Sequence, residues 1–238
     1  MAAMSLLSTT GVTRDFGGLR AVDHVDFDLP EGQIRALIGP NGAGKTTFVN
    51  LLCGRLPATA GRIAFAGEDV TRLPAHARIA RGMAYTFQIT SIFGALSLYD
   101  NVALAAQRRL GGGEALRPAV AAALDQVGLA DRANQPAGDL SYGHQRLLEI
   151  AMGLAQRPRL LILDEPTQGL ADAEIEGFVA LIRTVARDAT ILLIEHNMDV
   201  VMTLAERITV MDFGAILAEG APDEIKANLA VQTAYLGG

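Results

Sequence analysis

The chain has 238 residues, which is enough to bury a core, and its single cysteine, Cys53, excludes an internal disulfide framework and suits a reducing compartment. Its formal net charge of −6, without a cluster of basic residues, argues against nucleic acid as a partner. No segment approaches the roughly 18 uninterrupted apolar residues of a membrane span, and we expect no signal peptide in the first ten residues.

The first third of the chain predicts short strands with two intervening helices. Residues 12–29 alternate loosely between apolar and polar side chains and predict two strands joined across Gly17 and Gly18. Residues 34–38 form a short apolar run typical of a buried strand, and residues 46–53 predict a helix that ends at Gly54. We expect further strands at residues 61–67 and 82–87, and a short helix at residues 73–81.

The middle of the chain is mostly helical. Helices are predicted at residues 98–109, 118–127 and 144–156. The last of these carries apolar residues at helical spacing on one face: Leu147, Ile150, Ala151 and Leu154. We therefore interpret residues 89–157 as an inserted α-helical subdomain.

Strands and helices alternate again after residue 158. Buried strands are predicted at residues 159–163 and 190–194, an amphipathic helix at 172–188, and a hairpin at 207–219 that turns at Phe213–Gly214. This alternation indicates a parallel sheet covered on both faces.

A glycine-rich segment, here called the phosphate loop, lies between the strand at 34–38 and the following helix. It comprises Gly39, Pro40, Asn41, Gly42, Ala43, Gly44, Lys45, Thr46 and Thr47. Its glycines let several backbone N–H groups point into one cavity, and the helix N-terminus adds partial positive charge. Lys45 is placed to reach the β- and γ-phosphates of a nucleotide, and the Thr46 hydroxyl to ligate Mg²⁺. A chance match is the alternative, but the flanking strand and helix argue against it.

Four polar residues follow predicted strands and complete a hydrolytic site. Asp164 is expected to hold Mg²⁺, and Glu165 to orient or deprotonate the attacking water. His196 follows the strand at 190–194 and can contact the γ-phosphate, whereas Gln88 can join the metal and water network. Taken singly, these residues also fit solvated turns or a helix cap.

A second anion site is predicted where Ser141 and Gly143 precede a long helix. A plain helix cap is the alternative for this segment alone. The chain would then contain two phosphate-binding sites. Two copies arranged head to tail can place the phosphate loop of one copy and the Ser141 site of the other on opposite sides of one nucleotide.

These segments, in this order, resemble the ATP-binding subunits of ABC transporters over nearly the whole chain. The resemblance implies one ABC ATPase domain, residues 1–238, of the α/β class. Its P-loop NTPase (RecA-like) core spans residues 1–88 and 158–238 and includes an N-terminal antiparallel β subdomain. It also implies that Phe16 stacks on adenine, that two subunits enclose two ATP molecules with Mg²⁺, and that residues 89–157 touch the membrane partner.

Residues 141–151, 194–202 and 231–237 further resemble ATPase subunits of branched-chain amino acid importers, a family that also takes small amides and acids. This implies transmembrane permease subunits and a second ATPase subunit, identical or different, as partners. A periplasmic solute-binding protein would be an indirect partner, and the chain would lie peripherally on the cytoplasmic face of a bacterial inner membrane. A lipopolysaccharide-exporter ATPase, which residues 73–78 resemble, and a soluble ABC ATPase are the alternatives.

The chain departs from the family pattern at two places, one of which is the segment at 141–145, where Tyr142 and His144 replace the commoner Gly and Gln. The other is a functional loop. Ala171 stands where Asp or Asn is common, and Asp172 comes one residue later. This departure puts coupling between the two ATP sites in question.

Overall fold

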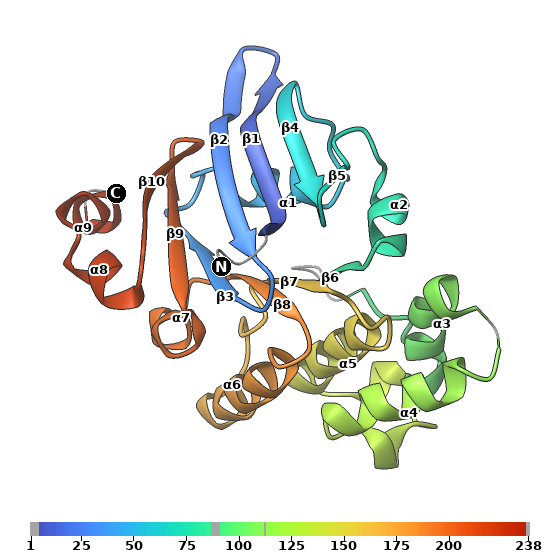
Figure 1. Cartoon of the computed structure of the whole chain (residues 1–238). Helices are drawn as coiled ribbons and strands as arrows, with labels where there is room; N and C mark the ends of the chain where they lie inside the picture. The colour runs from blue at the N-terminus through green and yellow to red at the C-terminus, as the bar shows by residue number, and fades with distance from the viewer. Residues whose placement is uncertain (1–4, 87–90, 112, 237–238) are drawn as a thin grey trace.

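Two sheets form the centre of the computed structural model, which describes residues 5–86, 91–111 and 113–236 (Figure 1). The strands of the first are β1 (Ser5–Phe16), β2 (Leu19–Pro30), β4 (Ala60–Phe65) and β5 (Glu68–Asp69). Those of the second are β3 (Ile34–Ile38), β6 (Met83–Thr86), β7 (Leu160–Asp164), β8 (Thr190–Ile194), β9 (Arg207–Asp212) and β10 (Ala215–Gly220). The first sheet is antiparallel in the order β2-β1-β4-β5. The second has the order β10-β9-β3-β8-β7-β6 and is parallel except between β10 and β9, which confirms the predicted sheet and hairpin.

The central strands β3, β7 and β8 of the second sheet are buried on both faces. Leu160 and Ile162 of β7 share an apolar cluster with the antiparallel sheet and with α1 (Lys45–Leu52). Leu161 and Leu163 point the other way, into a cluster with α5 (Tyr142–Leu154) and α6 (Asp172–Val185). Because successive strand residues alternate between two apolar layers, most positions of these strands are apolar, as the sequence pattern predicts, and Arg35, Asp164 and Thr190 are buried polar exceptions.

The helical region predicted for residues 89–157 contains α3 (Leu98–Leu110), α4 (Leu116–Gln126) and α5. These helices pack on one another beside the β6 edge of the sheet (Figure 1), through an apolar cluster that includes Val102, Leu124 and Leu148. The exact division into a core and a helical subdomain stays a prediction. The boundary at residues 88 and 89 lies outside the described residues.

The structure contains two features that the sequence pattern does not predict. β1 begins at Ser5, ahead of the expected start at residue 12, because its residues 7–9 pair with both β2 and β4. Four short helices surround the sheets: α2 (Ala75–Ala80), α7 (Met198–Leu204), α8 (Pro222–Ala227) and α9 (Leu229–Leu236). Of these only α2 is predicted from the sequence.

Candidate functional site

The carboxyl ends of β3, β7 and β8 border a cavity of about 480 Å³. Lys45, Thr46, Glu165 and His196 line it, so the structure brings together the phosphate loop and two residues predicted to be catalytic. The remaining lining residues are Leu19, Arg20, Ala21, Asn41, Gly42, Ala43, Gly44, Thr47, Phe213 and Gly214. Phe16, Ser141 and Gly143, which are also predicted to bind nucleotide, do not line it.

The phosphate loop requires glycine at two positions. Gly39 has φ 152° and Gly44 has φ 96°, values that L side chains rarely adopt. A Cβ atom at Gly39 would overlap the Met211 carbonyl oxygen, and one at Gly44 would overlap the Ala21 carbonyl oxygen. No side chain caps the N-terminus of α1, which begins at Lys45 directly after the loop. Such a loop and helix terminus present backbone N–H groups to an anion.

The Lys45 side chain lies folded within the loop. It is only 6% exposed, and its Nζ donates hydrogen bonds to the carbonyl oxygens of Gly39 (2.7 Å) and Pro40 (3.0 Å). Burial lowers the pKa of Lys45, whereas the charges of Glu165 and Asp164 act to raise it. The Lys45 ammonium group therefore lies inside the loop, where the oxygens of a bound phosphate can replace these two carbonyl oxygens as its hydrogen-bond acceptors.

Asp164 is buried at the end of β7 beside a tyrosine that the sequence analysis did not single out. The Tyr85 hydroxyl on β6 donates a 2.7 Å hydrogen bond to Asp164 Oδ2. Burial raises the pKa of Asp164 and the neighbouring Glu165 charge adds to this, while the Tyr85 hydrogen bond opposes it. Since β6 pairs with β7 in parallel, only the strand register places these two side chains together.

We expect Asp164→Asn to stabilise the nucleotide-free chain at pH 7. The pKa of Asp164 is higher in the folded chain than in the unfolded chain, so the folded state binds more protons at pH values between these two pKa values. The free energy of unfolding therefore falls as the pH rises through that range. Asparagine removes the buried charge and keeps an acceptor for Tyr85. Thermal unfolding across pH tests this, with exposed Asp188→Asn as the control. The melting temperature should rise at pH 7, and the gain should shrink in acid. A lower melting temperature at pH 7 would contradict it.

Glu165 and His196 contact each other in the lining of the cavity. His196 Nε2 lies 3.0 Å from Glu165 Oε1, and their side chains are 42% and 17% exposed. The Glu165 backbone has φ 48°, and its N–H donates to the Ile194 carbonyl at 2.8 Å, so the ends of β7 and β8 are joined here. A carboxylate held by a histidine beside a phosphate loop can orient or deprotonate water.

The three residues predicted to hold Mg²⁺ differ in how the structure places them relative to the cavity. Thr46 lines the cavity, Asp164 adjoins Glu165, and Gln88 lies outside the described residues. A hydroxyl and a carboxylate are oxygen ligands of the kind Mg²⁺ prefers, and Mg²⁺ usually keeps several waters. Within the described part of the chain, no group of three or more His, Cys, Asp or Glu forms a separate metal site.

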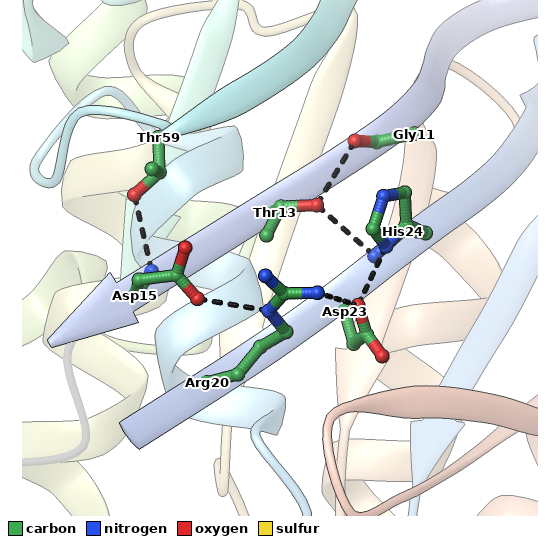
Figure 2. A network of polar contacts seen from close by, with 7 residues as sticks. All are labelled: Gly11, Thr13, Asp15, Arg20, Asp23, His24 and Thr59. Carbon is green, nitrogen blue, oxygen red and sulfur yellow. Dashed lines mark hydrogen bonds and ion pairs between the residues drawn. The ribbon is translucent and has the colours of Figure 1, made fainter. Parts of the chain in front are cut away.

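The β1–β2 hairpin forms one wall of the cavity and holds its charged side chains in a network (Figure 2). Arg20 donates to Asp15 (2.9 Å) and to Asp23 (3.0 Å), so its charge is already paired. Phe16 lies at the same hairpin and is 42% exposed. The Arg14 guanidinium carbon lies 4.4 Å from the centroid of its ring, so a cation covers the ring on that side.

Ser141 is the N-cap residue of α5 and Gly143 lies in its first turn, and neither residue lines the cavity that contains the phosphate loop. The Ser141 hydroxyl accepts from the His144 N–H (3.4 Å) and lies 2.7 Å from His144 Nδ1, so within one chain it caps the helix. A Cβ atom at Gly143 would overlap the Glu174 carboxylate of α6.

Comparisons with known proteins show which proteins the chain is similar to. The sequence model of the ABC transporter family matches residues 22–168, and that of the branched-chain amino acid ATP-binding cassette transporter matches residues 215–238. The chain is 40% identical to the high-affinity branched-chain amino acid transport ATP-binding protein BraF of Pseudomonas aeruginosa, over 98% of both chains. It is 39% identical to LivG of Escherichia coli, again over 98% of both chains.

Solved structures show the same fold. The ADP conformation of an ATP-binding cassette of an ABC transporter superposes with a TM-score of 0.90 at 26% identity, covering 99% of this chain and 100% of that one. A nucleotide-free cassette superposes equally well at 27% identity. These matches confirm the predicted fold class. Among the described residues, no helix is both long and apolar enough to cross a membrane.

Proposed function

The chain belongs to the ABC transporter family, and we propose that it is the ATP-hydrolysing subunit that powers a membrane importer of branched-chain amino acids or related small solutes. The observation that carries this proposal is the grouping of Lys45, Glu165 and His196 around one cavity. The proposed solute class rests on relatives that match nearly the whole chain and bear that name.

In this proposal each residue of the cavity has one role. The phosphate loop and Lys45 bind the ATP phosphates, and Thr46, Asp164 and Gln88 hold Mg²⁺, which would neutralise developing charge. Glu165 accepts a proton from the attacking water, and His196 orients both that carboxylate and the γ-phosphate. The 3.0 Å separation of His196 from Glu165 supports their acting together.

We propose that a second ATPase subunit completes each site with its own Ser141 and Gly143. The placement of these residues outside the cavity lined by Lys45 supports this arrangement. The N–H groups at the start of α5 would then face the γ-phosphate from the opposite side. Closure of the two subunits would depend on ATP.

We propose that the permease subunits bind at a second cavity, which has a volume of about 350 Å³. It lies among α2, β6, α3 and α5, and its lining includes Ile79, Met83, Leu104 and Met152. Leu104 and nearby Phe93 are 49% and 58% exposed, which suits contact with an apolar partner. This contact would place the chain on the cytoplasmic face of the membrane, while a solute-binding protein acts from the periplasm.

The experiment is to purify the chain from membranes with its bound partners and measure ATP hydrolysis in detergent. We expect permease subunits to co-purify, and hydrolysis to rise when the cognate solute-binding protein is added with leucine, isoleucine or valine. Stimulation by lipopolysaccharide instead would identify an exporter. Recovery without membrane proteins would contradict the proposal.

The proposed adenine contact gives a separate prediction. Phe16→Ala should weaken ATP and ADP binding about equally, by about 1–3 kcal/mol, because stacking on the base does not involve the γ-phosphate. Equilibrium titration of both nucleotides measures this, with exposed Phe93→Ala as the control. Unchanged affinity for both would assign the adenine contact to another residue near Val22.

A further inference from the structure

Glu195 is a buried carboxylate that lies between the two loops of the proposed hydrolytic site. It directly follows β8 and directly precedes His196, and it is 3% exposed. Its Oε1 accepts hydrogen bonds from the backbone N–H (3.0 Å) and the hydroxyl of Thr167. Its Oε2 accepts from the backbone N–H groups of His196 (2.7 Å) and Asn197 (2.9 Å).

These contacts join the segment that carries Glu165 to the segment that carries His196. Thr167 lies two residues after Glu165, in a turn closed by the hydrogen bond from Gln168 N to the Glu165 carbonyl (3.2 Å). One carboxylate therefore fixes the turn after β7 relative to the turn after β8. The 3.0 Å contact between His196 and Glu165 spans the same two turns.

The chemistry of this position requires a carboxylate. Each of its oxygens faces two donors, so an amide at residue 195 would direct its NH₂ group against donors in either orientation. Such a residue would release either Thr167 or the His196 turn. Burying a carboxylate is costly without compensating hydrogen bonds, and four of them compensate here.

We propose that Glu195 is a positioning residue for ATP hydrolysis, holding Glu165 and His196 at their working separation. This inference rests on the proposed function, because Glu195 acts only through those two residues.

The first test compares turnover with binding. We expect Glu195→Gln to lower kcat at saturating Mg-ATP by about 10- to 100-fold, since small displacements of catalytic groups are costly. The ATP dissociation constant should stay within about twofold, because Glu195 contacts neither the phosphate loop nor Lys45. A variant that loses ATP affinity and melting temperature but keeps its kcat would overturn the proposal.

Two substitutions at Thr167 provide a matched pair of variants that disturb the structure less, for use if the Glu195→Gln variant folds poorly. Thr167→Val removes the hydroxyl and keeps the shape, whereas Thr167→Ser retains the hydroxyl that bonds Glu195. We expect a lower kcat for Thr167→Val and near-complete rescue in Thr167→Ser. Equal kcat values for the two variants would overturn the proposal.

A double-mutant cycle separates this inference from the proposed function. In a His196→Ala background, Glu195→Gln should lower kcat by a clearly smaller factor than it does in the wild-type chain, because the part of its effect that acts through His196 is already lost. Fully multiplicative losses would overturn the inference. If Glu165→Gln and His196→Ala leave hydrolysis unchanged, the proposed function fails. If both lower hydrolysis and Glu195→Gln does not, only the inference fails.

Discussion

Replacing Glu165 with glutamine is expected to lower ATP hydrolysis by about 10²–10⁴, the usual scale for a lost general base, while ATP still binds. Glutamine keeps the size of the side chain and can still hydrogen-bond His196, but it cannot take the proton of the attacking water. Phosphate release by the assembled membrane complex measures the loss. Full-rate hydrolysis by the Glu165→Gln complex would remove Glu165 from the mechanism.

The same variant should accumulate a closed, ATP-bound pair of subunits if hydrolysis opens the pair, as the proposed function requires. Adding Ser141→Arg should prevent closure, since a bulky side chain would fill the second phosphate site. Size-exclusion chromatography with light scattering, with and without ATP, reads both outcomes. Pairing that survives Ser141→Arg would exclude the start of α5 as half of the site.

Replacing Lys45 with alanine is expected to abolish tight ATP binding. Each charge-assisted contact to a phosphate oxygen contributes roughly 1.5–3 kcal/mol, which is about 10-fold or more in the dissociation constant. Lys226, the other lysine of the chain, lies exposed on α8, so Lys226→Ala is a matched control. Equilibrium titration with ATP measures both variants. A dissociation constant for Lys45→Ala equal to that of Lys226→Ala would contradict the assignment of the phosphate loop.

Much of this site is predictable from the sequence because its residues are identified by their immediate neighbours in the chain. Buried strands of a parallel sheet are mostly apolar, so polar residues that closely follow them, such as Glu165 and His196, are conspicuous and meet at one edge. The glycines of the phosphate loop identify it for a similar reason, since the backbone angles of Gly39 and Gly44 suit few other residues.

Residues whose roles depend on a neighbouring strand or loop are not predictable in this way. Tyr85 reaches Asp164 only through the register of β6 on β7, and Glu195 resembles an ordinary charged residue after a strand. Ala171 provides a third case. The sequence shows only a missing polar side chain there, whereas in the structure the Glu174 carboxylate accepts from the Ala171 N–H (2.9 Å) and caps α6 from within the helix.

Uptake into proteoliposomes tests most directly whether ATP hydrolysis by this chain drives import. The vesicles would contain the chain with its co-purified membrane subunits, ATP on the side that carries the chain, and leucine-loaded binding protein on the opposite side. The proposed function predicts leucine movement toward the ATP side, with a rate lowered about 10²-fold or more by Glu165→Gln. Equal uptake rates with the wild-type chain and Glu165→Gln, or ATP-driven movement of leucine in the opposite direction, would contradict it.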